Sequence, residues 1–282
     1  MTQYTDHHGP EGLLTRGTIV VVPGRGEGRA AYARFGRRLA ADAYRVRVVD
    51  APRTDPEDLT GSLARFGDEL VAAVGGTAAE DGVARPVVLV GADTGALAVA
   101  ALLGLEGSSA ARLPDAVVLA GPPGPGADGG PVSTDAAGDE AEPWQDELDI
   151  RTFCPAHRAV LSDDSGTRRG SLATPVPEAL LDAAHRSDIP VPTLILLGDA
   201  DPLADRDALT RTAKSLPRAR LAVVRDAHPV SKPSSSATTK SSCALRYVRA
   251  RSSPRPWTWV RKPSLRRGVG EVMMCSPFGD RT

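Results

Sequence analysis

The feature that most constrains the fold is an alternation of short apolar strands with amphipathic helices. In VVLVGADTGALAVAALLG, residues 87–104, an aliphatic run stops at Gly91 and an Ala- and Leu-rich helix begins near Gly95, which predicts strand, tight turn and helix. Similar patterns predict strands at 18–22, 44–50, 116–120, 193–197 and 221–224, and helices at 30–43, 57–74, 177–187 and 207–217. Such an alternation predicts a mostly parallel sheet with helices on both faces.

The chain is predicted to divide into three parts. Residues 1–17 have no clear period and are expected to be a flexible N-terminus. Residues 18–228 hold all the predicted strands and form one α/β domain, with a ligand pocket at the C-terminal ends of the strands. Within this domain, residues 121–190 are expected to form a loop and lid insertion, because their first part is rich in Gly, Pro and acidic residues.

The composition changes after residue 228. Residues 229–282 contain eleven Lys and Arg residues against two acidic residues, whereas the preceding residues are net acidic. This segment has no sustained apolar period and is rich in Ser, Pro and Arg, so we expect it to be largely disordered and dispensable for the fold. No function is assigned to it.

Composition also narrows the classes of partner. Only 4% of the residues are aromatic, which argues against a specific nucleic-acid reader, and no apolar run approaches the length of a membrane span. Three cysteines, Cys154, Cys243 and Cys275, have no metal-ligand spacing and fit a reducing compartment. With no leader pattern at the N-terminus, the expectation is a soluble cytoplasmic protein that acts on a small molecule, without cofactor or metal, its oligomeric state left open.

Polar residues that could carry chemistry stand at three predicted strand ends. Asp93 lies in the tight turn after residues 87–91, Asp199 and Asp201 follow residues 193–197, and His228 follows the last strand. Small residues around Asp93 would let strand and helix approach closely and lift its side chain above the sheet. Alternatively, Asp93 or Thr94 only caps the following helix.

Residues 18–228 resemble the α/β-hydrolase superfamily, and residues 23–50 are similar to the opening segment of its monoacylglycerol lipase and lysophospholipase branch. The matching residues are Gly24, Gly26, Glu27, Tyr32, Leu39, Ala40, Tyr44, Val46 and Asp50. The resemblance implies an α/β-hydrolase fold with a catalytic set in the chain order Asp93, Asp201, His228. It also implies an oxyanion hole made by the backbone N–H groups of Arg25 and Thr94.

Two departures from this family pattern concern the chemistry. Pro23 stands where the family usually has histidine, and Asp93 stands where it has the nucleophilic serine. A carboxylate that attacks an ester carbonyl would form a reactive anhydride, whereas attack on a saturated carbon leaves an alkyl ester that histidine-activated water can cleave. Related enzymes with that chemistry place Trp after the Asp, where this chain has Thr94, and epoxide opening uses lid tyrosines that residues 121–190 lack.

The resulting function hypothesis is a hydrolase that acts on a small ester-like or alkyl substrate, with Asp93 in the nucleophile position and His228 as general base. A second hypothesis is a non-catalytic relative of the same fold that binds a small ligand or partner. A third is an NAD(P)-binding Rossmann oxidoreductase, because the glycine-rich turn is followed by Asp50 at the end of the next strand. That fingerprint is incomplete, since Arg29 stands where its third glycine belongs.

Overall fold

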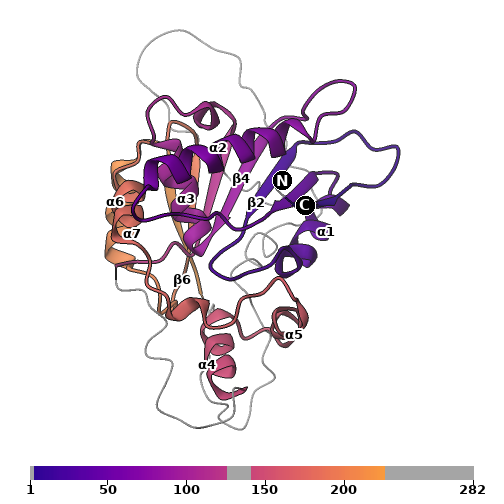
Figure 1. The fold of residues 1–282 in the computed structure, drawn as a ribbon. Coiled ribbons are helices and arrows are strands. Elements are labelled where there is room, and N and C mark those ends of the chain that lie inside the picture. Colours follow the sequence, from indigo (N-terminus) through magenta and orange to yellow (C-terminus); the bar gives the residue numbers. More distant parts are fainter. Residues whose placement is uncertain (1–2, 126–140, 226–282) are drawn as a thin grey trace, which may run out of the picture. The chain divides into compact units, whose positions relative to one another are not determined.

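Seven strands form one sheet in the order β1-β3-β2-β4-β5-β6-β7 (Figure 1). The structure, a computed structural model, describes residues 3–125 and 141–225. The strands are β1 (Tyr4–His7), β2 (Thr18–Val22), β3 (Arg45–Val49), β4 (Val87–Ala92), β5 (Ala116–Ala120), β6 (Thr193–Gly198) and β7 (Ala219–Val224). β1 pairs antiparallel with β3, and the other neighbouring strands are parallel, which confirms the mostly parallel sheet.

Helices pack on both faces of this sheet. The larger core cluster joins the sheet to α2 (Leu59–Gly75), α3 (Asp93–Leu103), α6 (Glu178–His185) and α7 (Arg206–Ser215). The opposite face packs against the short helix η1 (Arg29–Tyr32) and α1 (Ala33–Ala41). A further short helix, η2 (Ser109–Arg112), lies against α2 and α3.

The central elements are buried on every side. All five residues of β2, TIVVV, are buried, as expected for a strand covered on both faces. In α3, every residue from Gly95 to Leu103 is buried, so this helix runs through the core rather than along the surface. The site at the N-terminus of α3 is therefore carried on a rigid, fully packed element.

The N-terminal segment differs from the flexible arm that the sequence predicts, because Tyr4–His7 form β1 at the edge of the sheet. Asp6 accepts two hydrogen bonds from the Arg47 guanidinium, at 2.7 and 2.6 Å. The same guanidinium lies over the Tyr4 ring, 3.6 Å from its centroid. A strand of only four residues leaves little alternating pattern in a sequence. Arg47, the partner of Asp6, lies in another strand, β3, so no local pattern marks the pair.

The insertion contributes two kinds of structure. α4 (Ala141–Arg151) and η3 (Ser171–Ala173) contact the loop that follows β2, and α5 (Pro155–Asp163) contacts η1. In contrast, α6 packs against α3 within the main core, so this end of the expected 121–190 lid belongs to the helical layer. The predictions for residues 229–282 and for part of the acidic loop lie outside the described residues.

Candidate active site

Asp93 lies in the tight turn between β4 and α3, with a left-handed backbone (φ 46°) that is rare for residues other than glycine. Close approach of backbone segments fixes the turn. A Cβ atom at Gly95 would lie 2.3 Å from the carbonyl oxygen of Pro23, and one at Gly91 would lie 2.6 Å from the Cα of Ala96. The small residues around Asp93 therefore do what the sequence predicts, and the strained turn holds the side chain at the end of the strand.

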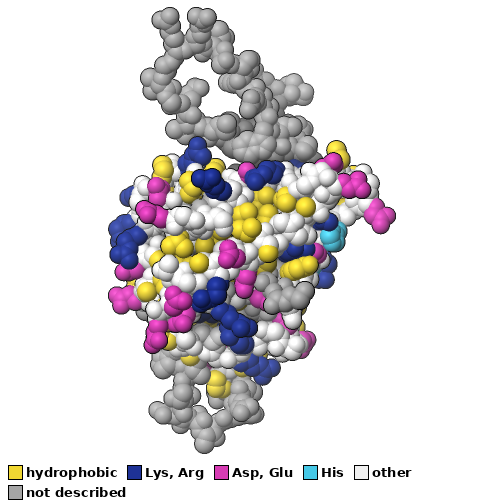
Figure 2. Space-filling model, turned by 45° about the horizontal axis from the view of Figure 1, so that its top comes forward, with side chains coloured by type: hydrophobic (Ala, Val, Ile, Leu, Met, Phe, Trp, Pro, Cys, Tyr) yellow, Lys and Arg dark blue, Asp and Glu magenta, His cyan; other side chains and the backbone are white. Residues whose placement is uncertain are grey.

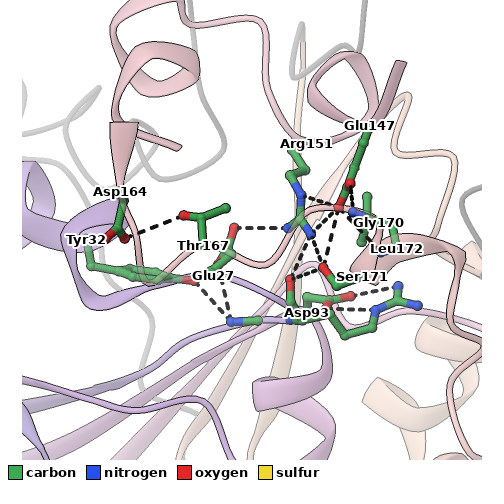
Figure 3. Close-up of polar contacts among 12 residues, drawn as sticks. Glu27, Tyr32, Asp93, Glu147, Arg151, Asp164, Thr167, Gly170, Ser171 and Leu172 are labelled. Atoms are coloured by element: carbon green, nitrogen blue, oxygen red, sulfur yellow. Dashed lines mark hydrogen bonds and ion pairs between the residues drawn. The ribbon is translucent and has the colours of Figure 1, made fainter. Parts of the chain in front are cut away.

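Arg25 holds the Asp93 carboxylate through three hydrogen bonds (Figure 3). Its Oδ2 atom accepts from the backbone N–H of Arg25 at 2.8 Å and from Nε at 3.0 Å, and Oδ1 accepts from Nη2 at 3.1 Å. The pair is mostly shielded from solvent, with 9% of the Arg25 side chain and 20% of the Asp93 side chain exposed. Ala92 occupies the N-cap position of α3, so Asp93 is not the capping residue.

The structure places the two predicted oxyanion-hole donors in different elements, Arg25 in the loop after β2 and Thr94 in α3. The N–H of Arg25 donates to Asp93 Oδ2, so the carboxylate itself occupies the place where a developing negative charge would be stabilised. Thr94 is the second residue of α3, in the first turn of the helix, where N–H groups lack an intrahelical acceptor. Of the two N–H groups, that of Arg25 is therefore already hydrogen-bonded to Asp93.

A buried tyrosine, Tyr32, stabilises the glycine-rich turn through Glu27. Tyr32 donates a hydrogen bond to Glu27 Oε2, and the N–H of Gly24 donates to the same atom at 3.2 Å. Burial, followed by the nearby Glu27 carboxylate, raises the pKa of Tyr32 well above its ordinary value, so its hydroxyl stays a donor. Glu27 and Tyr32, which support the family resemblance, therefore shape the turn that presents Arg25.

Asp201 follows β6 and accepts a hydrogen bond from the N–H of Leu203 at 3.0 Å. Burial and the neighbouring Asp93 charge raise the pKa of Asp201, while the Leu203 hydrogen bond opposes this rise. Asp199 is exposed, and His228 lies outside the described residues.

Two residues of the insertion, Arg151 and Ser171, contact the loop after β2 without having been predicted to do so, and Glu147 pairs with Arg151. The Arg151 guanidinium donates to Glu147 at 2.6 Å, to Ser171 Oγ at 2.6 Å and to the carbonyl oxygen of Arg25 at 2.9 Å (Figure 3). Glu147 and Arg151 are spaced i,i+4 on α4, a signal that could have identified the pair but not its contact with Arg25.

The surface charge, the potential metal ligands and the helix hydropathy of the described residues give no further indication of the chemistry. Basic and acidic side chains are interspersed on the face seen in Figure 2, without separation into one basic and one acidic area. Within residues 3–125 and 141–225 there is no group of three or more His, Cys, Asp or Glu residues that could hold a metal ion. Across the same residues, the helices are too short or too polar to cross a bilayer.

Residues 19–233 match the family model described as "Alpha/beta hydrolase family", which spans most of the chain. The chain belongs to this family. No curated protein sequence gives a significant match.

Solved structures share the fold of this alpha/beta hydrolase at low sequence identity. A soluble variant of monoglyceride lipase from Saccharomyces cerevisiae aligns with a TM-score of 0.57 and 15% identity, covering 80% of this chain and 83% of that chain. The Paleococcus ferrophilus monoacylglycerol lipase aligns with 0.54 and 15%, covering 82% and 91%. The enol-lactonase from Burkholderia xenovorans LB400 aligns with 0.52 and 17%, covering 88% and 92%. These likenesses confirm the α/β-hydrolase fold.

Family membership also bears on the dinucleotide hypothesis. In this alpha/beta hydrolase, Asp50, the residue that would have to bind a ribose, forms an ion pair with Arg29. In the glycine-rich turn, the N–H groups of Gly24 and Arg25 donate to Glu27 and Asp93, whereas the dinucleotide hypothesis would have such groups bind a pyrophosphate. The turn is thus built to position the protein's own carboxylates.

Proposed function

We propose that this protein is a hydrolase that uses Asp93 as a nucleophile on a small ester-like or alkyl substrate. His228 is assigned as the general base that activates water, and Asp201 as the carboxylate that orients His228. The observation that carries the proposal is the position of the Asp93 carboxylate, whose Oδ2 atom accepts two N–H donors from Arg25 in a strained turn at a strand end. The two carboxylate oxygens are therefore assigned different roles, Oδ1 as the attacking atom and Oδ2 as the atom held by Arg25.

In the first step, Asp93 Oδ1 attacks a saturated carbon of the substrate. A carbon–oxygen bond forms, the bond to the leaving group breaks, and the leaving group departs with the electron pair, which leaves an alkyl ester on Asp93. Oδ1 accepts one hydrogen bond from Arg25 Nη2, so a second lone pair remains for the attack. An ester-like substrate would be cleaved by the same attack on its alkyl carbon, which avoids an anhydride.

In the second step, water hydrolyses the alkyl ester. His228 takes a proton from water, and the resulting hydroxide oxygen adds to the Asp93 carboxyl carbon. The protonated His228 then donates its proton to the departing alkoxide, so the product leaves as an alcohol, and the new Asp93 carboxylic acid releases a proton to solvent to reform the carboxylate. Negative charge develops on Oδ2 during this step, and Oδ2 is the atom that lies 2.8 Å from the backbone nitrogen and 3.0 Å from Nε of Arg25. Arg25 would therefore stabilise the tetrahedral intermediate without moving.

A second candidate is a non-catalytic binding protein of the same fold. It is supported by the same ion pair, because Arg25 contacts both oxygens of Asp93 and a salt-bridged carboxylate is a weaker nucleophile. In that case Asp93 serves to fix the glycine-rich turn, and a ligand would bind without being cleaved.

Substrate turnover separates these candidates. We would assay p-nitrophenyl esters, epoxides and haloalkanes with the wild type, Asp93→Asn, Asp93→Ser and His228→Ala. A nucleophilic Asp93 predicts turnover by the wild type and a loss on the order of 10³-fold or more in Asp93→Asn and His228→Ala. Ester cleavage by Asp93→Ser alone would instead identify a latent serine-hydrolase scaffold.

Isotope transfer tests the covalent step directly. Hydrolysis of the alkyl ester in water enriched in heavy oxygen places solvent oxygen into the Asp93 carboxylate, because water adds to its carboxyl carbon. Mass spectrometry of the peptide that contains Asp93 should show this label after turnover by the wild type. Turnover without label in that peptide would overturn the nucleophile assignment, and absence of turnover on every substrate class would favour the binding protein.

A further inference from the structure

A buried ion pair connects the insertion to the glycine-rich turn. Glu147 and Arg151 are almost fully shielded from solvent, with 2% and 4% of their side chains exposed. Glu147 also accepts hydrogen bonds from the backbone N–H groups of Gly170 and Leu172, so each of its oxygens has a defined partner. The pair therefore joins α4 to residues 170–172 as one unit.

This unit holds Arg25 from two sides. Arg151 Nη2 and Ser171 Oγ donate to the carbonyl oxygen of Arg25, at 2.9 and 3.3 Å, and Arg25 Nη1 donates to the carbonyl oxygen of Thr174 at 3.1 Å. Arg151 Nη1 also lies 3.8 Å from Glu27 Oε1. The insertion thus contacts both the backbone and the guanidinium of Arg25.

The turn itself is packed tightly against the insertion. Gly26 has φ 66°, and a Cβ atom there would lie 1.9 Å from Ser171 Oγ. The N–H of Arg168 donates to the carbonyl oxygen of Gly26 at 2.8 Å. Residues 168–171 therefore follow the shape of the turn, and a shift of the insertion would carry Arg25 with it.

From these contacts we infer that Arg151 is a positioning residue, which holds Arg25 so that its N–H and Nε donors stay aligned on Asp93 Oδ2. A role in stability alone would not require this arrangement, since a buried ion pair gains little over well-packed apolar residues of similar volume. The charged pair, unlike apolar residues, also fixes the orientation of its partners. The planar Arg151 guanidinium donates to Glu147, Ser171 and the Arg25 carbonyl oxygen in a fixed geometry. The inference rests on the proposed role of Asp93.

The test compares Arg151→Met with Arg158→Met. Arg158 is the matched control, because it lies in the same insertion and pairs with Asp149 and Gln145 away from Arg25. In Arg151→Met we expect kcat to fall about 100-fold while KM stays within about threefold, because misplaced groups slow chemistry more than binding. Arg158→Met should retain the wild-type kcat. Equal losses in the two variants would overturn the inference.

Two further variants and a rescue keep the result independent of folding. Arg151→Lys keeps the positive charge beside Glu147 but cannot reach all three acceptors, so its kcat should lie between those of the wild type and Arg151→Met. Added methylguanidinium should restore part of the activity of Arg151→Ala, because it can fill the vacated guanidinium position. Full activity in Arg151→Lys, or absence of rescue in a folded Arg151→Ala, would count against a directional role.

A readout without turnover separates this inference from the proposed function. Carbon NMR of protein labelled at aspartate carboxyl carbons, with Asp93 assigned through Asp93→Asn, reports the carboxylate directly. The Asp93 resonance should shift in Arg151→Met and stay in place in Arg158→Met. If the wild type has no activity but the resonance shifts in this pattern, the proposed chemistry fails and the positioning role stands; an unmoved resonance in Arg151→Met overturns the positioning role whatever the activity.

Discussion

The two ends of helix α3 lie in contrasting surroundings. From Gly95 to Leu103 the helix is buried in an apolar layer made with α2, α6 and the sheet. At its N-terminus, Asp93 is held by Arg25, and Arg25 is held in turn by Arg151 and Thr174 from the insertion. Burial of apolar side chains, which is non-directional, therefore holds residues 95–103 in place. Charged hydrogen bonds, which are directional, hold the N-terminus of the helix at Asp93.

This contrast teaches where stability and precision come from in this molecule. The apolar end tolerates changes in side-chain identity as long as volume is kept, because packing alone is required. The polar end depends on particular hydrogen-bond donors and acceptors from three separated segments. Replacing one donor or acceptor is therefore expected to disturb the hydrogen bonds of the others. The following predictions probe the two ends in turn.

The largest loss of stability is expected at the apolar end, for Leu102→Ala. Leu102 is fully buried, and its Cδ1 atom lies within 3.0 Å of the position that a Cβ at Gly67 would occupy. Truncation leaves a cavity between α3 and α2, so the free energy of unfolding should fall by about 3 kcal/mol in denaturant titrations. Leu14→Ala is the control, because Leu14 is 93% exposed and its loss should change stability by less than about 0.5 kcal/mol. Similar effects for both leucines would refute this account of the core.

A smaller loss is expected at the polar end, for Glu147→Gln. The change removes the charge that pairs with Arg151 and places an amide NH2 among donors. Glu27 still lies near Arg151, so we expect the free energy of unfolding to fall by about 2 kcal/mol. Differential scanning calorimetry with Glu147→Gln and wild type measures it, and an unchanged melting temperature would show that the pair is dispensable for stability.

The smallest expected effect is a pH dependence that arises beside the same ion pair. Burial lowers the pKa of His157; Glu27 opposes this effect and Arg151 adds to it. Nε2 of His157 is buried and has no hydrogen-bond partner among residues 3–125 and 141–225. Because the folded-state pKa lies below that of the unfolded chain, the unfolded state binds the proton more readily and stability falls as pH drops through about 6.5.

His157→Leu isolates this contribution. Its free energy of unfolding should fall less steeply than that of the wild type between about pH 7 and pH 5, with a difference on the order of 1 kcal/mol or less. A part of the slope should remain, because burial and Arg37 also lower the pKa of His7. Parallel curves for the two proteins would show that His157 is protonated as readily in the folded protein as in the unfolded chain.

The sequence predicted the apolar part of the molecule well, because burial leaves a periodic pattern within each segment. Expected strands such as 18–22 and 116–120 match β2 and β5, and residues 57–74 correspond to α2. The turn at Asp93 could also be predicted, since its small flanking residues lie close in the chain. In contrast, the ion pair between the Arg25 side chain and Asp93 joins residues 68 positions apart, and the bond from Arg151 to Arg25 spans 126. Such pairs leave no local pattern.

The edge strand β1 has a practical consequence for work with this protein. Residues Tyr4–His7 complete the sheet beside β3, and Asp6 supplies the partner of Arg47, whose side chain is only 4% exposed. An expression clone that starts at residue 18, the predicted start of the domain, would expose the backbone hydrogen-bonding groups of β3. It would also leave the buried Arg47 guanidinium without its carboxylate partner, Asp6. Affinity tags joined to the N-terminus therefore need a linker long enough to leave Tyr4–His7 in place, and clone boundaries should keep these residues.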